Sequence, residues 1–306
     1  MREVIKSINL VKKYGNYTSL DNVNITVKQG EIYGLVGDNG AGKTTFLRIL
    51  TGQSHLTEGK IELLGKSSEK DLMKARRRVG TIIENPSFYG NLNLEQNLEY
   101  YRIQRGIPGK KNVEKVLKEV NLFDVKKKKF NDISLGMKQR LGIALALLGE
   151  PELLILDEPI NGLDPTGIAE IRKLLLKLKK EKNISIIISS HIVPELSNIA
   201  TCYGFIKKGK IIEEVTAEEL NERCKSYLEI NVSNPKKLSV LLEQNLGYKD
   251  YKVMPSGVIQ LYDKNPVTED ISELAVTNGI GLKGLYEKSI DLEKYYMSLI
   301  GGVNND

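Results

Sequence analysis

A glycine-rich octapeptide, Gly37-Asp-Asn-Gly-Ala-Gly-Lys-Thr44, constrains the fold of this chain more than any other feature. It fits the pattern G-x-x-x-x-G-K-[ST] and lies between the apolar run Ile32–Val36 and a helix-like segment, Lys43–Gly52. Glycines let backbone amides wrap a polyphosphate, and the following helix points its positive N-terminal end at it. Lys43 would reach the β- and γ-phosphates, and the Thr44 hydroxyl would bind Mg²⁺. The sequence therefore predicts a strand, a phosphate-binding loop and a helix that together bind a nucleotide.

Two adjacent carboxylates follow a second apolar run. Leu153-Leu-Ile-Leu156 predicts a buried strand whose carboxyl end carries Asp157 and Glu158. Asp157 can hold Mg²⁺, directly or through water, while Glu158 on the opposite side of the chain can take a proton from an attacking water. These residues supply the second half of a nucleotide site.

Apolar runs typical of strands alternate with segments that have apolar residues at helical spacing. This alternation predicts a parallel sheet covered on both faces. We expect strands at Val4–Leu10, Val23–Val27, Ile32–Val36, Ile61–Leu63, Val79–Ile83, Leu153–Leu156, Ile184–Ile188 and Tyr203–Ile206, and helices at Leu94–Arg105, Val113–Asn121, Leu135–Leu148 and Ile168–Lys180.

Length and charge distribution indicate two domains. The chain has 306 residues, and about 150 residues per domain is a common prior. Tyr101–Arg140 holds twelve Lys or Arg against four acids, whereas the residues from Ser226 onward hold eight Lys and eleven acids. We therefore predict domains at 1–222 and 223–306. The second has no phosphate-binding loop, so we expect a small non-catalytic α/β accessory domain, ending in an amphipathic helix at Leu292–Leu299 that packs on its own sheet or docks elsewhere.

The remaining composition argues for an intracellular, soluble protein. The longest uninterrupted apolar run, Ile143–Leu148, has six residues, whereas a membrane-spanning helix needs about 20. Residues 1–30 contain no apolar segment of the kind found in secretory signals. Two cysteines and two histidines lack the spacing of a zinc site, and they cannot form a disulfide framework.

A third motif, Ile133-Ser-Leu-Gly-Met-Lys-Gln-Arg140, lies between the first two. With a phosphate-binding loop before it and a strand ending in Asp-Glu after it, the chain resembles the nucleotide-binding subunit of an ATP-binding cassette (ABC) transporter. The resemblance covers residues 1 to about 218. The intervals also agree, with 91 residues from Lys43 to Ser134, 23 from Ser134 to Asp157 and 34 from Asp157 to His191.

The resemblance implies a role for several further residues. Tyr14 matches the aromatic residue that stacks on adenine, with Tyr17 as the competing candidate. Ser134 and Gly136 match the signature motif, which faces the γ-phosphate of ATP held by a second subunit. Asn161-Gly-Leu-Asp164 matches the D-loop, and His191 matches the switch histidine beside the attacking water. The implied ATP-binding residues are Tyr14, Gly37, Asp38, Asn39, Gly40, Ala41, Gly42, Lys43, Thr44, Thr45, Glu84, Ser134 and Gly136.

Three residues depart from the usual family pattern. Leu135 replaces a signature glycine, and Asn161 replaces a more usual serine in the D-loop. Glu84, in Thr81-Ile-Ile-Glu-Asn-Pro86, replaces the Q-loop glutamine. This glutamate variant resembles the ABC proteins of bacitracin export and lantibiotic self-protection.

The resemblance implies a P-loop α/β core, an N-terminal antiparallel β-subdomain and a helical insert at about 87–150. It also implies an ATPase that uses ATP and Mg²⁺, with Lys43, Glu158 and His191 as catalytic residues and Thr44 and Asp157 as metal ligands. Two copies would assemble head to tail beneath a separate membrane permease, at the cytoplasmic face of the membrane. The cargo stays open between a peptide antibiotic and another drug, lipid or ion. The rival from another class is a soluble ABC ATPase acting on ribosomes or DNA, but we expect no nucleic-acid partner.

Overall fold

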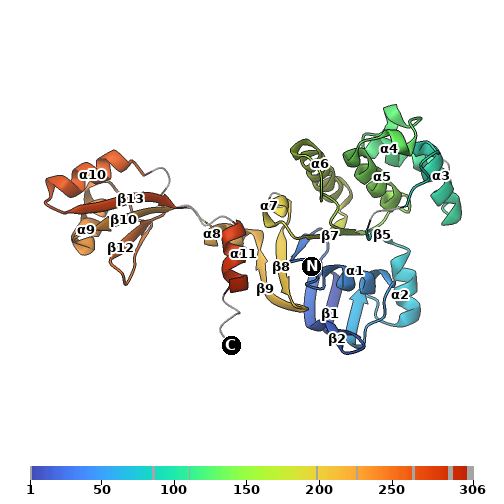
Figure 1. Ribbon diagram of the computed structural model, residues 1–306, viewed down its shortest axis with the longest axis horizontal. Coiled ribbons are helices and arrows are strands. Elements are labelled where there is room, and N and C mark those ends of the chain that lie inside the picture. The colour runs from blue at the N-terminus through green and yellow to red at the C-terminus, as the bar shows by residue number, and fades with distance from the viewer. Residues whose placement is uncertain are drawn as a thin grey trace. The chain divides into compact units, whose positions relative to one another are not determined.

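The chain divides into two compact units in the computed structural model (Figure 1). The structure describes residues 2–84, 87–109, 111–197, 199–224, 227–263, 266–288 and 292–301. The N-terminal unit extends to residue 217 and the C-terminal unit covers 218–301. The boundary predicted between 222 and 223 falls within helix α8 (Ala217–Arg223).

A six-stranded sheet forms the core of the N-terminal unit. Across the sheet its strands are β5 (Val79–Ile82), β6 (Leu153–Asp157), β7 (Ser185–Ser190), β3 (Ile32–Val36), β8 (Cys202–Lys207) and β9 (Lys210–Thr216). The first five strands are parallel, as the alternating pattern predicts, while β9 pairs antiparallel with β8 at one edge. Every residue of β3, β6 and β7 is buried, which is why these strands read as continuous apolar runs.

Helices α1 (Lys43–Thr51), α2 (Glu69–Arg76), α6 (Pro165–Lys182) and α7 (Val193–Leu196) connect these strands. Helix α1 begins at the phosphate-binding loop and ends at Gly52, whose φ of 81° gives it the left-handed conformation that commonly stops a helix. A glycine end was predicted here, and it is confirmed.

The antiparallel sheet of the N-terminal unit has the order β2-β1-β4. Strands β1 (Glu3–Tyr14) and β2 (Tyr17–Lys28) form a hairpin across the turn Gly15–Asn16, and β4 (Glu58–Leu63) pairs with β1. Apolar residues of this sheet and of helix α1 form one cluster with the parallel sheet, so the hairpin is packed against the phosphate-binding segment.

A helical segment is inserted between β5 and β6. It contains α3 (Leu94–Gln104), α4 (Lys111–Glu119) and α5 (Leu135–Leu147), and two short 3₁₀ turns at Phe123–Val125 and Phe130–Asp132. The Lys126–Lys129 run is partly neutralised, because Lys126 and Lys127 both pair with Glu95 of α3. The described helices include none long and apolar enough to cross a membrane.

The C-terminal unit is a four-stranded antiparallel sheet with the order β11-β12-β10-β13. The strands are β11 (Tyr251–Val253), β12 (Val258–Leu261), β10 (Tyr227–Val232) and β13 (Leu282–Lys288). Helices α9 (Pro235–Asn245) and α10 (Thr268–Thr277) pack their apolar side chains with those of the sheet. Helix α11 (Leu292–Gly301) buries Tyr296 of the predicted apolar stripe, while the side chain of Leu292 lies outside the described part.

Candidate functional site

The glycine-rich loop connects β3 to α1, so it leaves the sheet at the carboxyl end of a central strand. Gly40 and Gly42 have φ values of 81° and 112°, in the region that side chains other than glycine rarely adopt. A Cβ on Gly37 would lie 2.3 Å from the backbone oxygen of Ile206, so only glycine fits there. Asp38 and Asn39 are exposed at the tip, and Ala41 is buried. The loop therefore adopts a backbone conformation that requires glycine at positions 37, 40 and 42.

Lys43 lies beneath this loop rather than in solvent. Its side chain is 4% exposed, and Nζ donates hydrogen bonds to the backbone oxygens of Gly37 (2.6 Å) and Asp38 (3.1 Å). Nζ also lies 3.3 Å from Oε1 of Glu158, which follows β6. The lysine thus links the two halves of the predicted site.

Asp157 receives two hydroxyl hydrogen bonds at the carboxyl end of β6. Thr44 Oγ1 donates to Oδ2 at 2.8 Å, and Ser189 Oγ of β7 donates to Oδ1 at 2.6 Å. Asp157 is 8% exposed, so both bonds orient a buried carboxylate. The described residues contain no cluster of three or more His, Cys, Asp or Glu that could hold a metal alone. Carboxylate and hydroxyl oxygens nevertheless suit Mg²⁺, which usually keeps water and takes phosphate oxygens as its other ligands.

Glu158 is surrounded by three nitrogen groups. Oε1 faces Lys43, while Oε2 lies 3.1 Å from His191 Nδ1 and accepts a hydrogen bond of 3.1 Å from Asn161 Nδ2. Its backbone NH donates to Ser189 Oγ at 2.9 Å, and its φ is 46°, so the backbone departs sharply from the strand. The side chain is 23% exposed, which leaves it accessible to water. A carboxylate held in this way can act as a proton acceptor.

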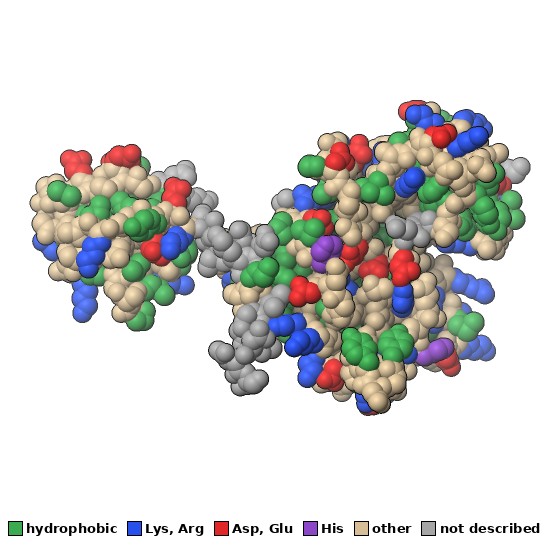
Figure 2. Space-filling model, viewed as in Figure 1, with side chains coloured by type: hydrophobic (Ala, Val, Ile, Leu, Met, Phe, Trp, Pro, Cys, Tyr) green, Lys and Arg blue, Asp and Glu red, His purple; other side chains and the backbone are tan. Residues whose placement is uncertain are grey.

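His191 lies within a partly buried polar turn at residues 190–195. Ser190 Oγ, at the end of β7, donates to Glu195 Oε2 at 2.9 Å and accepts from the Ile192 NH at 2.9 Å. Burial raises the pKa of Glu195, although the hydrogen bond from Ser190 acts in the opposite direction. Figure 2 shows acidic side chains gathered beside a histidine in the middle of the visible face of the N-terminal unit.

The signature residues lie at the N-terminus of α5. Ser134 caps this helix by accepting a hydrogen bond from the Met137 NH at 3.3 Å. A Cβ on Gly136 would meet no atom nearer than 3.9 Å, so its own chain leaves space for one. Leu135 is 46% exposed. The absence of a side chain at Gly136 therefore suits the approach of a group from outside this chain.

These signature residues line a hollow of 490 Å³ together with the D-loop and the start of α6. No residue of the glycine-rich loop lines that hollow. The described part of one chain thus keeps the signature and the phosphate-binding loop in separate places.

The two candidate adenine-stacking residues lie opposite one another at the end of the first hairpin. Tyr14 is 47% exposed and Tyr17 is 59% exposed, and the Tyr14 hydroxyl lies 3.3 Å from Ser54 Oγ. The hairpin reaches the nucleotide segment at Ser19, whose Oγ donates to Thr45 Oγ1 at 2.9 Å. Lys12 Nζ lies 4.5 Å from the centroid of the Tyr14 ring and so covers one face of it, and the choice between the two tyrosines stays open.

Glu84 follows β5 after one intervening residue, Ile83, and forms an ion pair with Arg48 of α1. Its φ is 62°, and its side chain is 67% exposed. Glu84 is expected to begin the link to the helical insert, and the next two residues of that link, Asn85 and Pro86, lie outside the described residues. The contact therefore connects the start of this link to the helix that begins at the glycine-rich loop.

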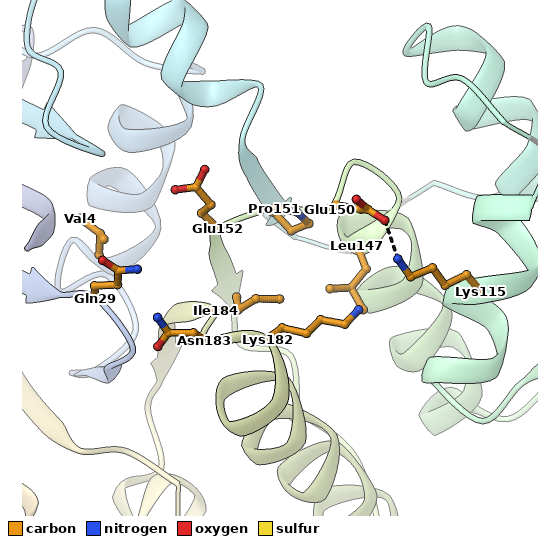
Figure 3. A pocket seen from close by; sticks show the side chains of 10 residues that line it. All are labelled: Val4, Gln29, Lys115, Leu147, Glu150, Pro151, Glu152, Lys182, Asn183 and Ile184. Carbon is orange, nitrogen blue, oxygen red and sulfur yellow. Dashed lines mark hydrogen bonds and ion pairs between the residues drawn. The ribbon is translucent and has the colours of Figure 1, made fainter.

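Another hollow, of 480 Å³, lies at the opposite, amino-terminal edge of the parallel sheet (Figure 3). Glu152 precedes β6 and Ile184 precedes β7, so these residues mark the edge away from the carboxylates. Lys115 pairs with Glu150 at 2.5 Å on one side of the hollow, and Lys182 pairs with Glu119. Because these charges are neutralised, this hollow does not offer the converging cations that a polyphosphate needs.

The sequence reasoning did not predict the contacts that Ser189, Asn161, Arg48 and Glu195 make in the site. Ser189 had a signal, because two serines end the apolar run of β7 beside the Asp157 strand. Asn161 was noted as the first residue of the D-loop and as a departure from the family pattern, but its hydrogen bond to Glu158 was not predicted. The partners of Arg48 and Glu195 become visible only when distant segments are placed together.

Comparison with known proteins agrees with this geometry. A family model described as ABC transporter matches residues 20–161. The chain is 45% identical to the bacitracin transport ATP-binding protein BcrA of Bacillus licheniformis, over 99% of both chains. It is 44% identical to the lantibiotic transport ATP-binding protein SrtF of Streptococcus pyogenes, over 69% of this chain and 90% of the relative.

Solved structures give the same result. The dimeric ATP-binding cassette MJ0796, in a post-hydrolysis state with ADP and Pi, superimposes with a TM-score of 0.62 at 26% identity. The match covers 70% of this chain and 98% of that one. The predicted P-loop α/β fold class is confirmed. The chain therefore belongs to the ABC transporter family, and it is an ATP-binding and ATP-hydrolysing subunit of that family.

Proposed function

We propose that this chain supplies ATP energy to a separate membrane permease that exports a peptide antibiotic. The observation that carries the proposal is the 45% identity to a bacitracin transport ATP-binding protein over 99% of both chains. This identity extends through the C-terminal unit, beyond the residues that the general ABC family model matches. A lantibiotic transport protein at 44% identity adds a second peptide class.

ATP would bind with its phosphates against the backbone amides of residues 37–44 and the N-terminus of α1. Lys43, already held beside this loop, would donate to the β- and γ-phosphate oxygens. Thr44 and Asp157 would hold Mg²⁺, because their neighbouring oxygens are ligands of the type this ion prefers. When bound, Mg²⁺ neutralises charge on the phosphate oxygens.

Hydrolysis would use Glu158 as the general base. As a water oxygen bonds to the γ-phosphorus, Glu158 takes the water proton and the bond to the β,γ-bridging oxygen breaks, leaving ADP and phosphate. His191, 3.1 Å from the same carboxylate, would orient the water and the γ-phosphate. The 23% exposure of the glutamate side chain supports this role, since a base must reach both water and substrate.

A complete site would need two copies of the chain. Gly136 has space above it, and the signature residues line a hollow separate from the glycine-rich loop. In a two-fold, head-to-tail dimer, Ser134 and Gly136 of one copy would approach the γ-phosphate held by the other. Because its relatives are transport ATP-binding proteins, we place the chain at the cytoplasmic membrane face through its permease.

Expression of the chain together with its permease should raise the tolerance of sensitive cells to a bacitracin-type or lantibiotic peptide several-fold. Growth inhibition is measured for both peptides, for a non-peptide drug and for a membrane-active lipid. The Lys43→Ala variant with the same permease provides the inactive control. Protection against the drug or the lipid alone would contradict the peptide cargo, while leaving the ATPase assignment intact.

Glu84→Gln should keep most ATP hydrolysis but change protection against the peptide. Glutamine removes the charge paired with Arg48 and adds a hydrogen-bond donor, and an exposed ion pair contributes only about 0–1 kcal/mol to stability. The fold and the site should therefore survive, while the coupling of ATP hydrolysis to the permease, which we assign to Glu84, changes. Phosphate release and growth protection are measured on the same variant.

Glu58→Gln is the matched control for this change, because it breaks another exposed ion pair, with Lys13. A loss of hydrolysis as deep as that of Glu158→Gln would give Glu84 a catalytic role instead. If hydrolysis and protection both stay unchanged, Glu84 is merely a solvated charge, and the argument for a peptide cargo weakens.

A further inference from the structure

Asn161 gives Glu158 a neutral hydrogen-bond donor. Unlike the histidine ring nitrogen, this amide does not titrate and always donates, and unlike Lys43 it is not expected to bind phosphate. Its Nδ2 lies 3.1 Å from Oε2, the same oxygen that faces His191 Nδ1. Lys43 lies on the other oxygen, at 3.3 Å. Lys43 is also expected to bind phosphate, and a histidine nitrogen can either donate or accept. Of the three groups, only the Asn161 amide therefore always donates to Glu158.

The backbone holds Asn161 in the position from which it reaches Glu158. Its NH donates to the Glu158 backbone oxygen at 3.2 Å, which closes a turn over residues 158–161. The next turn is closed by the Leu163 NH and the Ile160 oxygen at 3.3 Å, and Asp164 then caps α6. The main chain and the side chain of Asn161 thus both bond to the same residue, so the carboxylate and the D-loop are coupled.

The same loop packs directly beside the signature segment. A Cβ on Gly162 would lie 3.6 Å from Leu135 Cδ2, and one on Gly136 would lie 3.9 Å from Leu163 Cδ2. Helices α5 and α6 are further joined by an ion pair of 3.4 Å between Arg140 and Glu170. A shift of the signature residues would therefore move Gly162 and Leu163, and through them the neighbouring Asn161.

We propose that Asn161 is a positioning residue for Glu158, and that it couples the orientation of the catalytic carboxylate to the signature segment Ser134–Gly136. The inference rests on the proposed role of Glu158 as general base. It gives a function to Asn161 and a neighbour to Leu135, the two departures that the sequence left without an interpretation. Asn161 acts through Glu158 and takes no proton itself.

The test compares Asn161→Ala and Asn161→Asp in the purified full-length chain. Alanine removes the donor, so kcat should fall about tenfold while the KM for ATP changes less than twofold, as expected for a lost hydrogen bond to a charged group. Aspartate keeps the size and the turn-forming oxygen of asparagine, but it cannot donate when ionised and it places a negative charge beside Glu158. The Asp variant should therefore be slower than the Ala variant.

Asn112→Ala is the matched control, because it also removes one asparagine bond of 3.1 Å, here to the Pro108 backbone oxygen in the helical insert. Its kcat should stay unchanged. Asn161→Ala should also form the ATP-bound dimer at least as fully as wild type on gel filtration, because positioning affects the proton-transfer step and not assembly, and slower hydrolysis prolongs the ATP-bound state.

Several results would overturn the inference. If Asn161→Asp is as active as wild type, the residue only shapes the loop. If Asn161→Ala loses dimer formation or raises KM together with its loss of turnover, its role is structural. Unchanged kcat in Asn161→Ala, while Glu158→Gln is inactive, would refute the positioning role and leave the proposed base intact. If Glu158→Gln remains active, the base assignment fails, and a positioning role for Asn161 fails with it.

Discussion

Replacing Glu158 by glutamine should lower ATP turnover by about 100-fold or more, which is the usual contribution of a general base. Glutamine has nearly the same shape, but its amide cannot accept the proton of the attacking water. The residues expected to bind ATP are unchanged by the substitution, so nucleotide affinity should persist. The variant should therefore accumulate as an ATP-bound dimer, which gel filtration with and without ATP would detect.

Phosphate release by the purified variant measures the catalytic loss directly. Glu181→Gln provides a control, since it removes an exposed carboxylate that pairs with Lys177 at 4.0 Å and should leave turnover unchanged. Turnover near the wild-type rate in Glu158→Gln would show that another group accepts the proton. The contacts with Lys43, His191 and Asn161 would then only hold a structural carboxylate.

Local sequence patterns predicted the elements that position the site. Ile32–Val36 is both the predicted and the observed strand, because a buried parallel strand needs a continuous apolar run. Helix α1 ends where Gly52 adopts the left-handed conformation. Asp157 and Glu158 follow a run of the same type. These features depend on neighbouring residues alone, so one sequence was enough to find them.

Other elements gave too weak a local signal. Helix α2 (Glu69–Arg76) buries only Leu72 and Ala75, and strand β13 has charged and exposed residues along most of its length. Neither has the clear apolar period on which sequence reasoning depends. Strand β9 was missed for a similar reason, because most of its residues are only partly buried at the edge of the sheet.

The side-chain contacts of the site required the sheet order, which no local pattern contains. The order β6-β7-β3 brings Ser189 beside Asp157 and brings Glu158 beside Lys43, although these pairs are far apart in the sequence. The pairing of Arg48 with Glu84 depends in the same way on where α1 lies relative to β5. The residue types thus predicted the chemistry of the nucleotide site, whereas the hydrogen-bond and ion-pair partners of these residues follow only from the tertiary structure.

Replacing Lys43 by alanine should weaken ATP binding itself by about tenfold or more, the usual effect of losing hydrogen bonds from a charged donor. The lysine also donates to the backbone oxygens of Gly37 and Asp38, so its loss removes both a phosphate ligand and a support of the loop. Equilibrium binding of a non-hydrolysable ATP analogue measures the effect. In the same assay Glu158→Gln should bind like wild type, which separates binding from catalysis.

Because Lys43 is only 4% exposed, alanine also leaves a small cavity, and thermal unfolding must therefore be measured beside binding. Lys43→Met fills this space without the charge, and it should lose ATP affinity to the same extent while unfolding closer to wild type. Lys173→Ala, an exposed change in α6, should alter neither property. If folded Lys43→Met binds ATP with wild-type affinity, the phosphate contacts come from the loop backbone alone. The lysine would then serve only to hold Gly37, Asp38 and Glu158 in place.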